Sequence, residues 1–317
     1  MSPNWDHCEQ PHAANLEVVQ DCNLCRGQTF NQELKVSGWN LVRCSRCNLV
    51  FTSPRYTEEY LKSLYEKSYY EKAASYLCGQ LSAPYEDLYG LAKSARKLFK
   101  EEKRPRLRSL DVGCGGGVVV QAFKSMGWES VGIDPSEKAI ESGRRLGLDL
   151  RTVGIGSPEL GDFDLVTALH VLEHTYSPQK FLRDAGHRLK ENGYFILEVP
   201  NYESHGSMKW RQNWPHLFPD LHLYQFTPST VRRYLEGAHF EVLRIYKVNG
   251  RGPLENYDSN PRFDLLFRKE IKNGIFNIRK LIYWLPGSKH FVRWFYWQLL
   301  GYGEFIRVLS RKKYGGG

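Results

Sequence analysis

Short apolar runs alternate with segments of helical spacing through the middle of the chain, and this alternation predicts the fold. The apolar runs predict strands that begin near residue 110 and then cover 130–134, 148–153, 163–169, 194–199, 240–247 and 305–310. Helices are expected from Ser177-Pro178 to a stop at Asn192-Gly193, and from Thr227-Pro228 to a stop near Gly237. Strands that alternate with helices are typical of a parallel sheet. We therefore expect an α/β, doubly wound domain with a seven-stranded, mostly parallel sheet.

A glycine-rich turn follows the first predicted strand and indicates a ligand site. The chain reads Leu110-Asp-Val-Gly-Cys-Gly-Gly-Gly117 before an apolar helix. Gly113, Gly115 and Gly117 have no Cβ that would keep a ligand away from the backbone, and a helix N-terminus favours a negative group. A dinucleotide fingerprint would need glycine at 118, where this chain has Val. Asp111 suits a ligand with an ammonium and a sulfonium group, which favours S-adenosyl-L-methionine (SAM).

The second predicted strand, Ser130-Val-Gly-Ile-Asp134, ends in a carboxylate. An acid at this place can accept hydrogen bonds from both ribose hydroxyls of a nucleoside. Pro135 suits the first residue of a helix, so Asp134 could also be the N-cap of that helix. We expect Asp134 to bind the ribose of the cofactor, and capping is a second role that the sequence allows.

Four of the seven cysteines form two close pairs near the start of the chain. Two residues separate Cys22 from Cys25 and Cys44 from Cys47, and 18 residues lie between the pairs. Each pair can place two thiolates about 3.5 to 4 Å apart, as two corners of a tetrahedron. In a chain without a secretory signal, this pattern favours a metal over disulfides. We predict a zinc ribbon with a closed, structural Cys₄ site; two unrelated redox or core pairs are the alternative.

The order of the motifs resembles that of the class I SAM-dependent methyltransferases, over roughly residues 107–247. The motifs are Leu110–Gly117, Gly132-Ile-Asp134, Phe163-Asp-Leu-Val166, His170-Val-Leu-Glu-His174 and Glu198-Val-Pro-Asn201. The resemblance is closest to the branch that includes the ubiquinone-pathway O-methyltransferases. It implies a Rossmann-like methyltransferase sheet that binds SAM. The implied cofactor residues are Asp111, Gly113, Gly115, Gly117 and Asp134, with Leu169 and His170 where methyl transfer takes place.

The cysteine pairs ahead of such a domain narrow the resemblance. The arrangement is similar to bacterial enzymes of surface-polysaccharide and modified-sugar biosynthesis. This implies a small-molecule acceptor, with the methyl group going to a hydroxyl of a sugar, sugar nucleotide or lipid-linked saccharide. Some ribosomal-RNA guanine methyltransferases also carry a zinc module, but their second pair usually ends in His, where this chain has Cys47. A zinc-containing RNA methyltransferase and a non-catalytic SAM-binding scaffold are the alternatives.

A hydroxyl acceptor must lose its proton, and four histidines are candidates for the base. Methyl transfer is an in-line displacement that depends on positioning, and His takes up protons near neutral pH. His222 lies in a loop after the fifth predicted strand, where the carboxyl ends of strands form the ligand crevice. We predict His222 as the base and rank His170 second, ahead of His174 and His216. Glu173 is expected to tether a helix start or a loop.

Charge adds a candidate partner surface near the end of the chain. Residues 251–317 hold 13 Lys and Arg against 5 Asp and Glu, out of 44 against 35 in the whole chain. Runs such as Phe291-Val-Arg-Trp-Phe-Tyr-Trp297 are typical of helices that lie in a membrane interface. An anionic membrane surface is therefore a candidate partner, a helical cap packed on the domain is the alternative, and nucleic acid is not expected. With no signal peptide and no long apolar run, we expect a cytoplasmic protein that could attach to the inner membrane face.

The predicted organisation has six parts. They are a flexible tail (1–20), the zinc ribbon (21–55), a tyrosine-rich helical lid or linker (56–104), the SAM-binding core (105–250), a basic aromatic helical insertion (251–303), and the last core strand with a tail (304–317).

Overall fold

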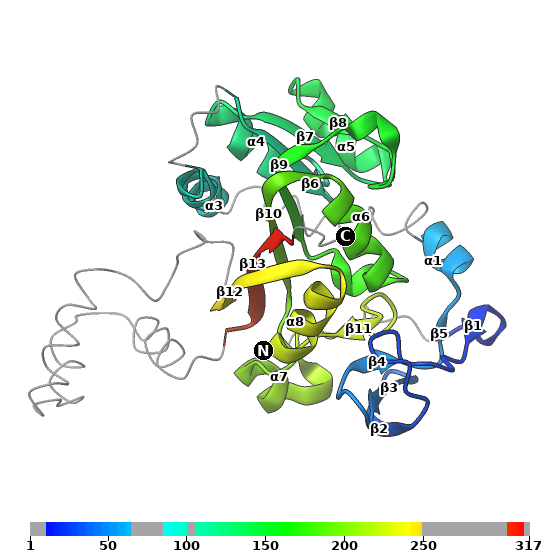
Figure 1. The fold of residues 1–317 in the computed structure, drawn as a ribbon. Coiled ribbons are helices and arrows are strands. Elements are labelled where there is room, and N and C mark those ends of the chain that lie inside the picture. Colours follow the sequence, from blue (N-terminus) through cyan, green and yellow to red (C-terminus); the bar gives the residue numbers. More distant parts are fainter. Residues whose placement is uncertain (1–10, 65–84, 100–105, 249–302, 314–317) are drawn as a thin grey trace, which may run out of the picture.

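A seven-stranded sheet forms the centre of the molecule (Figure 1). The structure is a computed structural model that describes residues 11–64, 85–99, 106–248 and 303–313. In spatial order the strands are β12 (Phe240–Val248), β13 (Phe305–Lys312), β10 (Leu189–Pro200), β9 (Phe163–Leu169), β6 (Arg108–Val112), β7 (Glu129–Ile133) and β8 (Asp149–Arg151). The five strands from β10 to β8 are parallel, and β13 runs antiparallel to both β10 and β12. The predicted doubly wound, mostly parallel sheet is confirmed.

Helices cover both faces of this sheet, so its central strands are apolar on both sides. The helices are α1 (Glu58–Leu64), α3 (Tyr85–Lys97), α4 (Val118–Ser125), α5 (Glu137–Arg145), α6 (Pro178–His187), α7 (His205–Trp210) and α8 (Pro228–Gly237). Within β9, Leu165 belongs to the apolar cluster under α3 and α4. The next residue, Val166, belongs to the cluster under α6 and α8. Successive side chains of a strand point to opposite faces, so β9 serves both layers.

One predicted boundary is wrong. The helix expected to stop at Asn192-Gly193 ends at His187 instead, and β10 begins at Leu189. Asn192 has a φ of 61°, and the pairing of β10 with β9 shifts register between Leu189 and Tyr194. The Asn-Gly pair therefore forms a bulge within a strand, a place that tolerates positive φ as well as a helix end does.

The N-terminal module, residues 11–56, is built mainly of short strands. Strand β1 (Leu16–Glu17) pairs with β5 (Arg55–Tyr56). Strands β2 (Phe30–Val36), β3 (Trp39–Cys44) and β4 (Val50–Thr52) form an antiparallel sheet, and β11 (Tyr224–Gln225) adds a fourth strand. Figure 1 shows this module beside β11 and α8. Strand β11 belongs to the core segment that follows β10 in the chain. The four-stranded sheet is therefore built from strands of both the module and the core.

A single apolar cluster continues from the module into the core. It includes Trp39 and Phe51 of the module together with Leu223 and Tyr234 of the core. Hydrogen bonds also join the module to the core. The Tyr234 hydroxyl donates to Oδ1 of Asn23 at 3.2 Å. Buried Arg55 also donates to the Tyr224 hydroxyl at 2.9 Å.

Several predicted segments lie outside the described residues. They include residues 1–10 of the N-terminal tail, residues 65–84 and 100–104 of the tyrosine-rich segment, and the basic aromatic insertion except Gly303. Helix α3 of the tyrosine-rich segment packs on α4, and Phe99 just after it meets Trp128 edge-on at 5.5 Å. None of the helices in the described part has the length and apolar composition that a bilayer span requires.

Candidate active site

The glycine turn connects β6 to α4, and its glycines serve two different purposes. Gly113, Gly115 and Gly117 all have positive φ, at 71°, 49° and 82°. A Cβ on Gly113 would lie 2.5 Å from Cγ2 of Val171, and one on Gly117 would lie 2.9 Å from Cδ1 of Leu148. A Cβ on Gly115 would meet no described atom within 4 Å. Gly113 and Gly117 are therefore required by the packing of the protein, whereas Gly115 borders space that a ligand can enter.

Asp134 lies against this turn, where the carboxyl ends of β6 and β7 meet. Its Oδ2 accepts from the Gly115 N–H at 3.0 Å, and its Oδ1 accepts from the Ser136 N–H at 2.9 Å. An acid at the end of the second strand of such a fold is placed to accept hydrogen bonds from ribose hydroxyls. Asp134 is not the N-cap of α5, because that role belongs to Ser136, whose side chain accepts from the Ala139 N–H.

Asp111 is buried on β6, and Oγ1 of Thr167 donates to its Oδ1 at 2.6 Å. Gly117 is the N-cap of α4 and offers no side-chain cap. The N–H groups at the start of α4 can therefore bind a carboxylate. The acid, the glycine turn and the uncapped helix fit a ligand that carries both an ammonium and a carboxylate group, as SAM does.

His170 follows Leu169 at the carboxyl end of β9 and holds the centre of a buried ionic network. Its backbone is left-handed, with a φ of 57°, and its N–H donates to the Glu198 carbonyl at 2.9 Å. Nε2 lies 3.1 Å from Oε1 of Glu198, and Nδ1 lies 3.5 Å from Oε1 of Glu173. Burial alone would lower the pKa of His170, but the two carboxylates raise it to about 9. His170 is therefore a cation at neutral pH that can donate from both ring nitrogens.

Glu198 and Arg307 complete the network from β10 and β13. Both side chains are fully buried, and Nε of Arg307 donates to Oε2 of Glu198 at 2.6 Å. Burial raises the pKa of Glu198, yet Arg307 and His170 outweigh it and lower the pKa to about 2. Sequence reasoning missed Arg307, because its partner lies 109 positions earlier in the chain.

His222 and His174 lie side by side, with ring centroids 4.6 Å apart. Nδ1 of His222 lies 2.9 Å from the His216 carbonyl, and Nδ1 of His174 lies 3.2 Å from the Leu221 carbonyl. A carbonyl oxygen only accepts, so each ring donates from Nδ1. Burial lowers the pKa of both histidines and lowers that of His216 to about 4. The structure thus brings all four predicted histidines together, and it adds Glu173, which is buried and whose ligand atom lies within 4.8 Å of those of His174 and His222.

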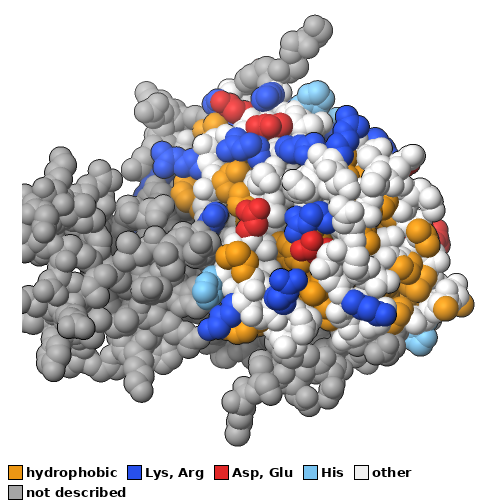
Figure 2. All heavy atoms as spheres, turned by 90° about the horizontal axis from the view of Figure 1, so that it is seen from below, with side chains coloured by type: hydrophobic (Ala, Val, Ile, Leu, Met, Phe, Trp, Pro, Cys, Tyr) orange, Lys and Arg blue, Asp and Glu red, His pale blue; other side chains and the backbone are white. Residues whose placement is uncertain are grey.

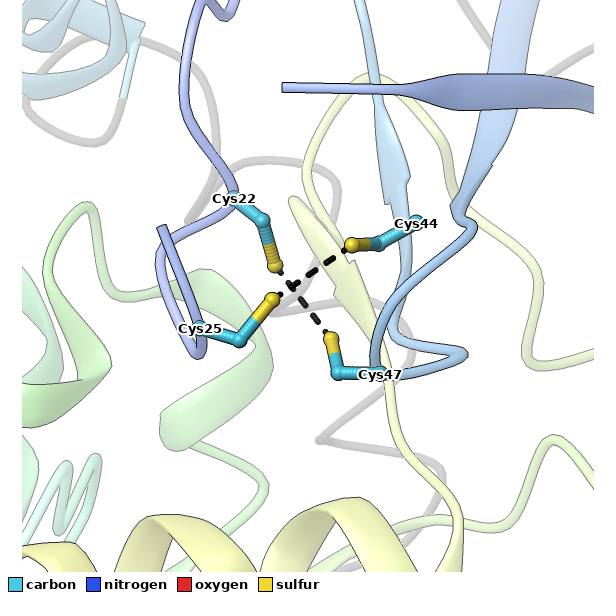
Figure 3. A group of neighbouring side chains, drawn as sticks. All are labelled: Cys22, Cys25, Cys44 and Cys47. Carbon is cyan, nitrogen blue, oxygen red and sulfur yellow. Dashed lines mark hydrogen bonds between the residues drawn. The ribbon is translucent and has the colours of Figure 1, made fainter. Parts of the chain in front are cut away.

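The four cysteines converge from two loops of the N-terminal module (Figure 3). The Sγ atoms of Cys22 and Cys47 are 3.4 Å apart, those of Cys25 and Cys44 are 3.5 Å apart, and all four lie within 4.8 Å of one another. Four sulfurs on one tetrahedral zinc ion are about 3.8 Å apart, so the cluster fits the ion.

The two cysteine loops have the same backbone path. In each loop, the residue after the second cysteine, Arg26 or Asn48, has positive φ and donates its N–H to the carbonyl of the first cysteine. This repeated geometry orients two thiols of each loop toward the same point. The spacing in the sequence therefore predicted the cluster correctly.

The N-terminal module also holds the loop that carries His222. The Thr52 N–H donates to the Leu223 carbonyl at 3.1 Å, and the Leu223 N–H donates to the Glu173 carbonyl at 2.8 Å. Strand β4 then pairs with β11 directly after that loop. Three segments that are distant in sequence are thus tied together at the histidine cluster.

Comparison with known proteins identifies the family to which this chain belongs. A family model described as "Methyltransferase domain" matches residues 85–245. The ubiquinone biosynthesis O-methyltransferase of Azorhizobium caulinodans is 37% identical over 107 residues, which cover 30% of this chain and 41% of that protein. That of Parvibaculum lavamentivorans is 31% identical over 121 residues, or 36% of this chain and 46% of that protein. The chain therefore spans less than half the length of these relatives.

A likeness to solved structures supports the same fold. The plantazolicin methyltransferase BpumL in complex with SAH covers 80% of this chain and 94% of its own, with a TM-score of 0.52 and 13% identity. At this identity the likeness shows the fold alone.

Proposed function

Because this chain belongs to the methyltransferase-domain family, we propose that it is a SAM-dependent methyltransferase that methylates a hydroxyl group of a small-molecule acceptor. One observation carries the proposal. The side chain of Val171 lies against the position that a Cβ on Gly113 would take. Val171 is also the residue directly after His170 of the ionic network. The cofactor turn and the histidine cluster are therefore adjacent at one edge of the sheet, where ligands of such folds bind.

The cofactor residues that we propose are those at the glycine turn. Asp134 would accept the ribose hydroxyls, Asp111 would face the ammonium group, and the N–H groups of α4 would bind the carboxylate. Gly113, Gly115 and Gly117 shape the turn, and Leu169 and His170 would border the transferred methyl group. When bound, SAM supplies a sulfonium-linked methyl group; the S–C bond breaks as the O–C bond forms, and the sulfur keeps the electron pair.

We propose His222 as the group that takes the hydroxyl proton. Its Nδ1 donates to the His216 carbonyl, which leaves the lone pair of the neutral ring on Nε2. His170 lies between two carboxylates that favour its protonated form, so it is a poorer base than His222.

The class of acceptor rests on two arguments. The curated relatives are named as O-methyltransferases, which supports oxygen as the methylated atom. The cysteine module resembles that of modified-sugar enzymes, which supports a saccharide hydroxyl. RNA is less favoured, because Lys and Arg are interspersed with acidic and uncharged side chains on the face seen in Figure 2, within the described residues. Binding to nucleic acid would call for a continuous basic surface.

We also propose that Cys22, Cys25, Cys44 and Cys47 bind Zn²⁺. The supporting observations are the close approach of the four sulfurs and the matched backbone of the two loops. Four protein ligands fill a tetrahedral shell, so this ion would be structural.

Calorimetric titration with SAM tests the cofactor residues. Asp134→Ala removes the acceptor for the ribose hydroxyls, so we expect the affinity to fall by roughly 10- to 100-fold, as for lost hydrogen bonds to a charged group. Asp149→Ala is the matched control, because Asp149 is an exposed acid on the neighbouring strand β8. Equal affinity in wild type and Asp134→Ala would contradict the proposed ribose contact.

Release of S-adenosylhomocysteine tests the acceptor. The full chain should turn over with hydroxyl compounds drawn from sugar nucleotides, lipid-linked saccharides or catechols, and His222→Gln should slow turnover by about 10²- to 10⁴-fold. His187→Gln, at the exposed end of α6, is the control. Turnover with RNA and with none of the small molecules would reject the proposal.

The predicted attachment of a cytoplasmic protein to the inner membrane face rests on residues 251–303, nearly all of which lie outside the described part. We propose that this segment binds anionic lipid. At low salt, the full chain should sediment with phosphatidylglycerol vesicles. High salt should release it from the vesicles into the supernatant. A chain that stays in the supernatant at low salt would contradict this.

A further inference from the structure

We propose that Glu173, His174 and His222 form a binding site for a divalent transition-metal cation. This site is separate from the four cysteines and lies at the edge of the sheet where the acceptor is expected. One ligand atom from each of the three residues lies within 4.8 Å of the other two. Two imidazoles and one carboxylate are a ligand set used by Zn²⁺, Fe²⁺ and Co²⁺.

Both histidines are oriented as metal ligands usually are. In metal sites a histidine typically donates its other N–H to a carbonyl or carboxylate, which fixes the ring and its tautomer. Here Nδ1 of His174 donates to the Leu221 carbonyl at 3.2 Å, and Nδ1 of His222 donates to the His216 carbonyl at 2.9 Å. In both neutral rings the coordinating atom is therefore Nε2.

Glu173 supplies the negative charge of the site. Its side chain is 1% exposed, and within the described residues neither carboxylate oxygen makes a hydrogen bond. The contact with Nδ1 of His170 is long, at 3.5 Å, and His170 lies closer to Glu198. This long contact offsets only part of the cost of burying a carboxylate without hydrogen bonds. A divalent cation bound at Glu173 would remove much of the remaining cost.

The backbone holds the three ligands in place independently of their side chains. Glu173 and His174 lie in one short turn, Leu172–His174, after β9. The Leu223 N–H donates to the Glu173 carbonyl at 2.8 Å, which fixes the His222 loop against that turn. The pairing of β4 with β11 supports the loop from its other side. The site is thus assembled by three elements of the fold.

Three protein ligands leave at least one position of the cation open, as in catalytic metal sites. An acceptor hydroxyl at that position would lose its proton more readily, because coordination lowers its pKa and the proton can pass to solvent. The cation would then perform the task assigned above to Nε2 of His222. This catalytic role rests on the proposed function, whereas binding of the cation does not.

Cobalt binding tests the site directly. The full chain, with the four cysteines filled by one equivalent of Zn²⁺, is titrated with Co²⁺ and followed by visible absorption. Cobalt bound to nitrogen and oxygen gives weak d–d bands, whereas cobalt that replaces zinc at the cysteines adds intense thiolate charge-transfer bands. We expect one further equivalent of Co²⁺ with only the weak bands. Glu173→Gln and His222→Gln should each weaken its binding at least about tenfold, and His187→Gln should leave it unchanged.

Circular dichroism and the thermal unfolding midpoint of each variant show whether the fold is retained, and His174→Gln replaces any variant that does not fold. Failure of wild type to bind cobalt without thiolate bands would overturn the site. Equal cobalt binding in wild type and in every folded variant of Glu173, His174 or His222 would overturn it as well. Because the readout is metal binding, a negative result leaves the acceptor and the methyl transfer to be judged separately.

Discussion

Arg307 is a fully buried arginine, and Glu198 is the residue that makes its burial tolerable. The pair joins β13 to β10, and His170 places its ring against the same glutamate from β9. A charge in such a place depends on its partner, because removal of one partner leaves the other charge buried with much less compensation.

We therefore expect Glu198→Gln or Arg307→Met to lower the free energy of unfolding by about 3 to 5 kcal/mol. Glu241→Gln is the matched control, because Glu241 of β12 pairs with Arg311 of the same strand β13 at exposed positions. That change should cost no more than about 1 kcal/mol. Urea unfolding measures all three, and similar values for the buried and the exposed pair would contradict the argument.

The same glutamate gives the protein an acid-sensitive element. Its pKa is about 2 in the folded protein and about 4.3 in an unfolded chain. The stabilisation that it provides is complete above the unfolded pKa and is lost as the pH falls toward 2. Wild type should lose more stability than Glu198→Gln between about pH 5 and pH 2, as thermal unfolding at a series of pH values can show. Parallel curves would mean that Glu198 is not the group responsible.

Two glycines near the cofactor should respond differently to the same substitution. A Cβ on Gly143 would lie 2.5 Å from the Gly116 carbonyl oxygen, so Gly143→Ala should destabilise the fold by about 1 to 3 kcal/mol. At Gly115 the space is open and only the φ of 49° is unfavourable, so Gly115→Ala should cost about 1 to 2 kcal/mol but weaken SAM binding. Unfolding and calorimetry, measured together, separate the two effects. Unaltered SAM affinity in Gly115→Ala would show that the cofactor does not approach this position.

At the scale of elements, local patterns predicted what is local. The strands of the seven-stranded sheet, the glycine turn and the cysteine loops were predicted from runs and spacings of a few residues. The Asn192-Gly193 bulge was misread as a helix stop, because both structures accept the same residues at positive φ. The approach of His222 to Glu173 joins residues 49 positions apart, and the pairing of β4 with β11 joins residues 173 to 175 positions apart. No pattern within either segment encodes such an approach, so the structure was needed to find it.

The β4–β11 pairing predicts that the cysteine cluster supports the active site at a distance. Cys47→Ser should remove one ligand of the proposed zinc ion and loosen the segment that follows it, including Thr52 and its hydrogen bond to Leu223. We expect faster amide hydrogen exchange at 50–52 and 222–225, together with lower activity. Ser45→Ala, an exposed position in the same loop, is the control. Faster exchange confined to the cysteine loops would show that the two sites are independent.

For the whole molecule, the continuous apolar cluster matters more than the predicted division into parts. Cys44, Trp39 and Phe51 of the N-terminal module belong to the same cluster as the core residues under α6 and α8. We predict that module and core unfold in one cooperative transition, and that far-UV circular dichroism and tryptophan fluorescence give the same midpoint. Two separate transitions would show that the N-terminal module folds as an independent unit.

The position of β13 has a consequence during synthesis of the chain. Phe305–Lys312 lies between β10 and β12, although both of these strands are made well before it. Until residue 312 has left the ribosome, β10 and β12 each present an unpaired edge, and Glu198 lacks its ion pair with Arg307. An incomplete chain in this state exposes strand edges that can pair with another chain. Protection of nascent chains by chaperones should therefore matter until the last strand of the sheet has been inserted.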